Sequence, residues 1–227
     1  MRHAEILWFD GKIIPWHKGK IHIMNAGVQY GLNPFDHIRF YNTPKGPALF
    51  RAREHYERLQ HSASTLHILV RYAVEELING TKELVRQSAA YNGSCRPIIT
   101  CGDEATGLYV PLAKEQVHVG IGLYYWEDEQ KREPIRMHIS PLERIDNRNS
   151  DPSIKVAGNY LQARLAYDIA KAKGFDDAIL LCRGYVTEAT GANIWIVKRG
   201  ELLTPVEGAI LPGITRDTIM TLAEDRG

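Results

Sequence analysis

The chain has 227 residues, enough for one large domain or two modest ones whose cores need no disulfide or metal. Its composition, 44% hydrophobic and 24% charged, is typical of a globular protein and unlike a disordered, fibrous or membrane chain. With 28 basic and 27 acidic side chains it has no net field to attract nucleic acid or an anionic membrane, so neither is expected as a partner.

The cysteines and the N-terminus indicate a cellular setting. Cys95, Cys101 and Cys182 are odd in number and lack close-pair spacing, so we expect neither a disulfide framework nor a metal site, and a reducing cytoplasm fits best. An acidic residue, Glu5, follows soon after Met1, and no apolar run there has the length of a signal peptide or membrane span. Met1 is therefore expected to be a genuine start.

The first part of the chain predicts a small α+β domain over residues 1–126. Two strand-like segments flank Asp10-Gly11, a strong signal for a β-hairpin. Apolar periodicity predicts further strands over residues 38–41, 48–51, 97–101 and 117–126, and helices over 53–69 and 74–91.

A charged stretch over residues 127–134 ends in Pro134 and is expected to be an exposed connector between domains. Beyond it, strands are expected over residues 135–139, 178–182, 194–197 and 202–203, and helices over 159–173 and 214–224. Residues 135–227 are therefore expected to form a larger second domain. Its last helix has an apolar face but little chain after it to pack against, so we expect this domain to be incomplete at its C-terminal end.

Lys155 is the first candidate for chemistry. It is a single lysine within an apolar, glycine-containing segment that leads from Asp151 into a helix near Tyr160. Such a lysine is suited to Schiff-base formation, although most lysines in similar segments lie on protein surfaces.

Glu188 is the second candidate. It lies among small and turn-forming residues between Gly184 and Trp195, so its carboxylate could be buried and would then require a partner. A protonated pyridine nitrogen would be one such partner. An exposed acid at a strand end explains the residue equally well.

Two segments could bind a phosphate. Gly213-Ile214-Thr215 lies at a predicted helix start that Thr215 could cap, and backbone N–H groups at such an end suit an anion. The segment Phe50–Leu59 contains Arg51, Arg53 and Arg58, and an arginine can fork onto two phosphate oxygens. Capped helices that bind no anion, and charges on a solvated helix face, are the commoner explanations of these patterns.

Together these motifs resemble the class IV, or fold type IV, pyridoxal-phosphate-dependent aminotransferases, and most of all the branched-chain amino-acid aminotransferases. The order and spacing of the motifs agree over nearly the whole chain. Supporting segments lie at residues 24–31, 35–41, 46–51 and 95–97. The resemblance implies a two-domain α/β (α+β) fold like that of D-amino-acid aminotransferase, pyridoxal 5'-phosphate as cofactor, and a homodimer or larger assembly.

The resemblance also implies roles for single residues. Lys155 would hold the cofactor through a Schiff base and move the proton between the substrate Cα and the cofactor. The other implied cofactor contacts are Glu188 at the pyridine nitrogen, Tyr160 beside the ring hydroxyl, and Arg58, Gly213, Ile214 and Thr215 at the phosphate. The implied substrate contacts are Arg96 near the α-carboxylate with Tyr30 and Arg39 close to it, and Phe35 and Trp126 at the side chain.

Some residues depart from the branched-chain pattern. This chain has Pro34-Phe35-Asp36-His37 where those enzymes usually read valine, phenylalanine, glutamate and glycine, and Ser94 where a pocket tyrosine is usual. His37 could be a polar group of the pocket or a structural histidine. Family members also continue for about another third of this length, with a Gly-Thr-Ala turn that helps to bind phosphate and carboxylate.

The expected function is transamination of leucine, isoleucine or valine with 2-oxoglutarate, which gives the branched 2-oxo acid and glutamate. A D-amino-acid or (R)-amine aminotransferase is the alternative, because a proline before the lysine also occurs in those relatives. An aminodeoxychorismate-lyase-like reaction is more distant. The alternative of a different class is a truncated, non-catalytic cofactor-binding protein.

Overall fold

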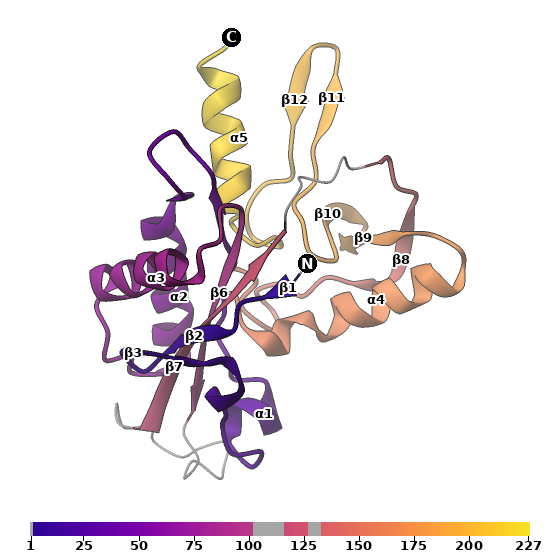
Figure 1. The fold of residues 1–227 in the computed structure, drawn as a ribbon. Coiled ribbons are helices and arrows are strands. Elements are labelled where there is room, and N and C mark those ends of the chain that lie inside the picture. Colours follow the sequence, from indigo (N-terminus) through magenta and orange to yellow (C-terminus); the bar gives the residue numbers. More distant parts are fainter. Residues whose placement is uncertain (1, 102–115, 127–132) are drawn as a thin grey trace. The chain divides into compact units, whose positions relative to one another are not determined.

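The computed structural model of the chain describes residues 2–101, 116–126 and 133–227 (Figure 1). These residues form two compact units. Lys155–Gly158 pack with the N-terminal unit, while Asn159–Gly227 and the residues before Lys155, back to the expected connector, form the second. The second unit is therefore discontinuous along the chain. Residues 127–132 of the expected connector lie outside the described residues.

The first unit is built on a seven-stranded sheet with the strand order β3-β2-β7-β6-β4-β5, in which β1 also pairs with β7. Every pairing in it is antiparallel. Its strands are β1 (Arg2–His3), β2 (Ile6–Phe9), β3 (Lys12–Pro15), β4 (Ile38–Tyr41), β5 (Ala48–Leu49), β6 (Gly93–Cys101) and β7 (Val117–Tyr125).

The predicted hairpin is confirmed. Asp10 and Gly11 join β2 to β3 with φ angles of 48° and 87°, the left-handed conformation that a two-residue hairpin turn requires. Short helices η1 (Trp16–Lys18) and α1 (Ala26–Tyr30) follow before β4. α1 was not predicted, because five residues are too few to show helical periodicity.

Two longer helices, α2 (Ala52–Thr65) and α3 (Val74–Ser88), lie side by side and pack on one face of this sheet (Figure 1). Each buries an apolar stripe, with Tyr56 and Leu59 from α2 and Leu77 and Leu84 from α3 fully buried. Burial of such side chains contributes about 1.5–3 kcal/mol each.

The predicted bounds of several first-unit elements are wrong. The helix expected over residues 53–69 ends at Thr65, and the strand expected over residues 97–101 begins at Gly93. The strand expected over residues 48–51 stops at Leu49, because Arg51 takes a left-handed conformation as the N-cap of α2. The second helix ends at Ser88 rather than at residue 91, because Ala89 is also left-handed.

The second unit has a three-stranded sheet of order β10-β9-β8, with β8 (Met137–Glu143) parallel to β9 (Asp177–Cys182) and β10 (Tyr185–Ala189) antiparallel to β9. A 3-10 helix, η3 (Ala157–Tyr160), leads into α4 (Leu161–Ala172). α4 packs on the sheet through alanines, which allow its close approach to β8 and β9.

The rest of the second unit is a hairpin of β11 (Ile196–Lys198) and β12 (Glu201–Leu203), followed by α5 (Ile214–Glu224). The bounds of α5 are those predicted. β10 was not predicted, because small and turn-forming residues obscure its alternation. The first unit is α+β and the second contains a parallel β8–α4–β9 crossover, so the predicted α/β (α+β) class is confirmed.

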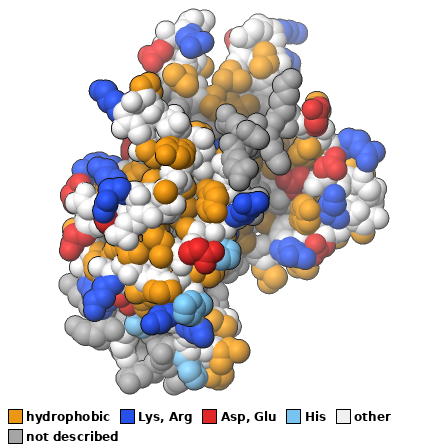
Figure 2. All heavy atoms as spheres, viewed as in Figure 1, with side chains coloured by type: hydrophobic (Ala, Val, Ile, Leu, Met, Phe, Trp, Pro, Cys, Tyr) orange, Lys and Arg blue, Asp and Glu red, His pale blue; other side chains and the backbone are white. Residues whose placement is uncertain are grey.

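On the face seen in Figure 2, side chains of both charges are interspersed, in keeping with the near-zero net charge. Among the residues that the structure describes, no helix is long and apolar enough to cross a membrane.

Candidate functional site

Lys155 is fixed by backbone hydrogen bonds to the segment that precedes β4. Phe35 N–H donates to the Lys155 carbonyl, Ala157 N–H to the Asn33 carbonyl and Gly158 N–H to the Gly31 carbonyl, each at 3.0 Å. Lys155 N–H donates to Oγ of Ser62 on α2, also at 3.0 Å. The lysine backbone is thereby held on both sides.

The three backbone hydrogen bonds between residues 31–35 and 155–158 are called the Lys155 ladder below. Glycine is required at its first residue, Gly31. Gly31 ends α1 in a left-handed conformation with φ of 71°. A Cβ at Gly31 would lie 3.0 Å from Cα of Gly158, tighter than side chains normally pack.

The Lys155 side chain lies over an aromatic ring, with Nζ 4.8 Å from the centroid of Phe35. A cation in this position is attracted by the negative face of the ring. The structure thus brings together Lys155, predicted to carry the chemistry, and Phe35, predicted to contact the substrate.

Arg58 lies on α2 and forms a two-pronged ion pair with Asp36. Its Nε donates to Oδ2 of Asp36 at 2.9 Å and an Nη donates to Oδ1 at 2.8 Å. His55 Nδ1 lies 2.8 Å from the same Oδ1, and the Asp36 side chain is fully buried. Burial would raise the pKa of Asp36, but the hydrogen bonds from His55 and Arg58 outweigh it and hold this pKa well below its usual range.

Arg39 and Arg96 each contact an aromatic ring. The Arg39 guanidinium lies 5.4 Å from the centroid of Trp126, and that of Arg96 lies 5.5 Å from the centroid of Tyr124. Among the described residues no carboxylate forms an ion pair with either arginine. The first unit therefore contains three of the residues predicted to contact the substrate. They are Arg39, Arg96 and Trp126.

Tyr30 is the last residue of α1, and its side chain is 43% exposed. It directly precedes Gly31, so only its backbone lies near the Lys155 ladder, with its carbonyl oxygen 3.8 Å from a Cβ built at Gly158. The structure gives no contact between its ring and the predicted arginines.

In the second unit, Glu188 lies on β10 and is buried, which is one of the two interpretations that the sequence left open. Arg144 donates from Nε to Oε1 at 2.6 Å, while Asn193 Nδ2 and the backbone N–H of Leu211 donate to Oε2, each at 3.1 Å. The partner that burial demands is thus supplied by an arginine within the protein. The carboxylate still lines a small pocket together with Tyr160.

Gly213, Ile214 and Thr215 form the start of α5. The N-cap is Gly213 and no side chain caps the helix, so the expected cap by Thr215 is wrong. Thr215 is instead the second helical residue, where a backbone N–H has no acceptor within the helix.

Asn193 links Glu188 to this helix start. It donates to Glu188 and to the Leu211 carbonyl, and a Cβ at Gly213 would lie 1.9 Å from its Oδ1. Glycine is therefore the residue that lets the α5 start lie against Asn193. A buried acid and a helix N-terminus are held in one rigid arrangement.

Sequence reasoning missed Arg144, His55 and Asn193 as functional candidates. Arg144 precedes Glu188 by 44 residues, and no motif marks it. Asn193 lies in the same sequence segment as Glu188 and pairs with it across the turn at Gly191. Its side-chain amide, a possible hydrogen-bond donor to the acid, was the sequence signal that could have identified it.

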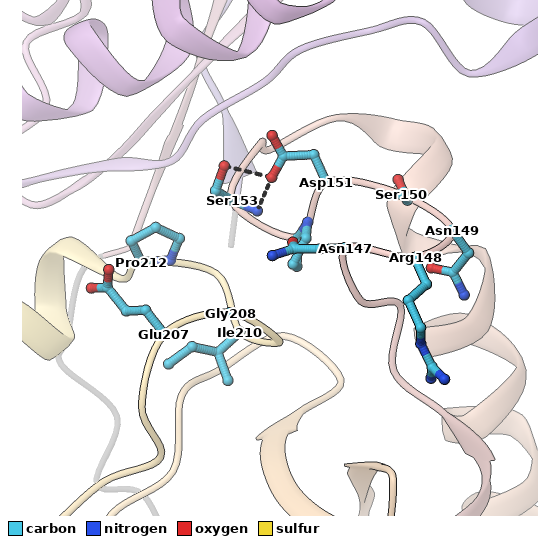
Figure 3. A pocket seen from close by; sticks show the side chains of 11 residues that line it. Asn147, Arg148, Asn149, Ser150, Asp151, Ser153, Glu207, Gly208, Ile210 and Pro212 are labelled. Atoms are coloured by element: carbon cyan, nitrogen blue, oxygen red, sulfur yellow. Dashed lines mark hydrogen bonds between the residues drawn. The ribbon is translucent and has the colours of Figure 1, made fainter.

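The second unit has a larger pocket of about 530 Å³ beside the predicted residues (Figure 3). Its charged side chains already have partners, since Asp151 accepts from Ser153, Arg148 pairs with Asp146, and Glu207 pairs with Arg216. Volume alone therefore does not make it the better candidate, and none of the predicted site residues lines it.

Comparison with known proteins identifies the class. The family described as "Amino-transferase class IV" matches residues 34–227. The chain belongs to the class IV aminotransferase family, and its fold is the fold type IV α/β structure of the branched-chain enzymes.

Individual relatives are branched-chain enzymes. The chain is 34% identical to the branched-chain-amino-acid aminotransferase of Escherichia coli (strain K12), over 100% of this chain and 75% of the relative. The crystal structure of the branched-chain aminotransferase from the thermophilic archaeon Thermoproteus uzoniensis with norvaline matches with a TM-score of 0.92 and 32% identity, over 99% of this chain and 76% of that chain.

A crystal structure of another branched-chain amino acid aminotransferase, with its source abbreviated T.th., matches with a TM-score of 0.92 and 34% identity. The match covers 99% of this chain and 74% of that chain. That enzyme, called the T.th. enzyme below, is complexed with N-(5'-phosphopyridoxyl)-L-glutamate.

Each unit, taken by itself, has residues that suit one part of a pyridoxal phosphate. A carboxylate has about four acceptor positions, and the contacts of Glu188 use three, so one remains for a protonated ring nitrogen. The α5 start presents backbone N–H groups without a capping side chain, which suits a phosphate. Lys155 supplies the amine that a carbonyl cofactor requires.

Proposed function

We propose that the chain is a pyridoxal-phosphate-dependent aminotransferase that moves the amino group of leucine, isoleucine or valine to 2-oxoglutarate. The observation that carries the proposal is the backbone ladder that fixes Lys155 with its amine over Phe35. The T.th. enzyme binds a compound that joins the phosphopyridoxyl group to glutamate, which supports the same chemistry for this chain.

Within this proposal the cofactor, when bound, supplies an electron sink conjugated with the substrate amine. Lys155 would hold the cofactor through its amine and, once released by the substrate amine, would move the proton at the substrate Cα. Glu188 would pair with the ring nitrogen, and Arg144 orients the Glu188 carboxylate by donating from its Nε to Oε1. Tyr160 would lie beside the ring hydroxyl.

Phosphate binding is assigned to Arg58 and the start of α5. Asp36 holds the Arg58 guanidinium in one orientation, so less side-chain freedom is lost when an anion binds. Gly213, Ile214 and Thr215 contribute the helix N-terminus.

Substrate binding is assigned to the first unit. Arg96 and Arg39 attract the carboxylate of the amino acid. Phe35 and Trp126 provide aromatic surface on which a branched aliphatic side chain gains from leaving water.

Assembly as a homodimer or larger oligomer belongs to the proposal. Ile23, Met24, Val28 and Tyr30 are large apolar side chains near α1 that are between 43% and 73% exposed. An exposed group of this kind suits burial against another copy of the chain. Light scattering during size-exclusion chromatography measures the mass directly, and a monomer would contradict this part.

The function is tested by 2-oxo acid formation from L-leucine, L-isoleucine or L-valine with 2-oxoglutarate and added cofactor. We expect turnover by the wild type and none by Lys155→Ala. The control is Lys173→Ala, which removes an exposed lysine at the end of α4.

Parallel assays with D-alanine and (R)-1-phenylethylamine separate the alternative specificity. Faster turnover of either compound than of L-leucine would replace the branched-chain assignment. Cofactor binding without turnover of any donor would contradict an enzymatic function.

A further inference from the structure

His37 directly precedes β4, and the β4–β6 register, extended by one residue, places it opposite Arg96 on β6. In the β4–β6 register Ile38 pairs with Cys95, and the Asp36 N–H donates to the Pro97 carbonyl. His37 and Arg96 are therefore partners across the strands, and side chains of such partners point to the same face, with Cβ atoms about 4.5–5.5 Å apart.

Arg39, two residues beyond His37 along β4, points to this face as well. The charges that act on the His37 ring come from Arg39 on β4, Arg96 on β6, Lys155 on the ladder segment, and the adjacent Asp36. Asp36 is the one acidic residue among these charges. Its carboxylate already accepts hydrogen bonds from Arg58, His55 and the backbone N–H of His37. The face is therefore electropositive.

The His37 ring is half-buried, and among the described residues its nitrogens have no hydrogen-bond partner. Burial, followed by repulsion from Arg96, Arg39 and Lys155, lowers the pKa of His37 to about 4. At pH 7 the ring is then neutral, with one N–H to donate and one nitrogen to accept.

We propose that His37 is a substrate-binding residue, whose ring N–H donates a hydrogen bond to the carboxylate that Arg96 holds. This inference rests on the proposed function, because it deepens the assignment of Arg96 to the substrate carboxylate. His37 and Arg96 offer two donors side by side, and together they match the two oxygens of one carboxylate.

Carboxylate binding is coupled to proton uptake by the same residue. A bound anion offsets the repulsion from the surrounding cations and favours the charged imidazolium. The pKa of His37 therefore rises in the complex, and the affinity for the anion increases as the pH falls toward this raised value.

The test measures equilibrium binding of 4-methylvalerate, a carboxylate without an amine, to the cofactor-loaded full chain. His37→Phe retains a ring but has no N–H, and His37→Asn retains a donor. We expect His37→Phe to weaken binding about tenfold or more, the loss typical of a hydrogen bond to a charged group, and His37→Asn to restore part of it. His61→Asn, at an exposed residue of α2, is the matched control.

The second readout is the NMR titration of the His37 ring, with its signal identified by its absence in His37→Asn. We expect 4-methylvalerate to raise the pKa by roughly one unit or more, as a nearby opposite charge does. An unchanged titration, an unchanged affinity in His37→Phe, or no binding by the wild type would each overturn the proposal.

These outcomes are distinct from failure of the proposed function. His37-dependent binding without turnover would reject transamination and keep the inference. Transamination of leucine with an unchanged KM in His37→Phe would keep the function and reject the inference.

Discussion

Asp36 in the first unit and Glu188 in the second are both buried carboxylates paired with an arginine. Their side chains are 0% and 8% exposed, and the arginine contacts are 2.8 Å and 2.6 Å. By burial and charge alone the two acids are equivalent. Their remaining acceptor capacity separates them.

The oxygens of Asp36 accept four hydrogen bonds, two from Arg58, one from His55 and one from the His37 backbone. A carboxylate accepts about four hydrogen bonds. Three of these contacts fall on Oδ1 and one on Oδ2, and the complete burial of the side chain keeps a ligand from Oδ2. Glu188 accepts three and lines a pocket. Asp36 is therefore expected to position other groups, and Glu188 to bind a ligand.

The largest expected effect is on stability, in Asp36→Asn. The substitution removes the ion-pair partner of Arg58, whose side chain is only 13% exposed, so we expect the free energy of unfolding to fall by about 3–5 kcal/mol. Chemical denaturation measures the change. Asp168→Asn, which breaks an exposed pair with Arg164, is the control and should change stability by less than about 1 kcal/mol.

The pH dependence follows from the same residue. Because the pKa of Asp36 is lower in the folded than in the unfolded state, its contribution is fully present above about pH 4 and is lost as the pH falls through the folded pKa. The stability of Asp36→Asn should therefore vary less with pH below about pH 4 than that of the wild type. Parallel acid-denaturation curves would show that Asp36 is not ionised in the fold.

Glu188→Gln is expected to act mainly on catalysis. It removes the negative charge proposed to hold the ring proton, so we expect kcat with L-leucine to fall about 100-fold, a typical loss for one preorganised electrostatic contact. Glu83→Gln, on the exposed face of α3, is the control. If folded Asp36→Asn lost more kcat than Glu188→Gln at saturating cofactor, the contrast between the two acids would fail.

Gly213→Ala should give the smallest of the three effects. The added Cβ meets the Asn193 amide, and we expect a loss of about 1–3 kcal/mol of stability from this overpacking. Gly191→Ala is the matched control, since a Cβ there meets nothing within 4 Å. Equal melting temperatures for the two variants would show that Asn193 moves away without cost.

Local sequence signals predicted the elements whose determinants are local. Asp10-Gly11 specifies its hairpin through left-handed turn residues, and α5 begins and ends where its apolar spacing does. β10 and α1 were missed because short segments with small residues carry little periodicity.

The site was predictable in its residues but not in its partners. Lys155 and Glu188 stand in recognisable segments, whereas Arg144 and Asp36 acquire their meaning from contacts made 44 and 22 residues away. The grouping of Lys155–Gly158 with the first unit likewise depends on long-range backbone pairing. Such pairings are set by tertiary packing, which residue spacing does not encode.

The most direct test of the account identifies the lysine that carries the cofactor. The protein is incubated with pyridoxal 5'-phosphate, treated with borohydride to fix the carbon–nitrogen bond, digested, and mapped by mass spectrometry. The account predicts a phosphopyridoxyl group on Lys155 in the wild type and none on that peptide in Lys155→Ala. A group on another lysine, or no modification of Lys155, would contradict the central assignment.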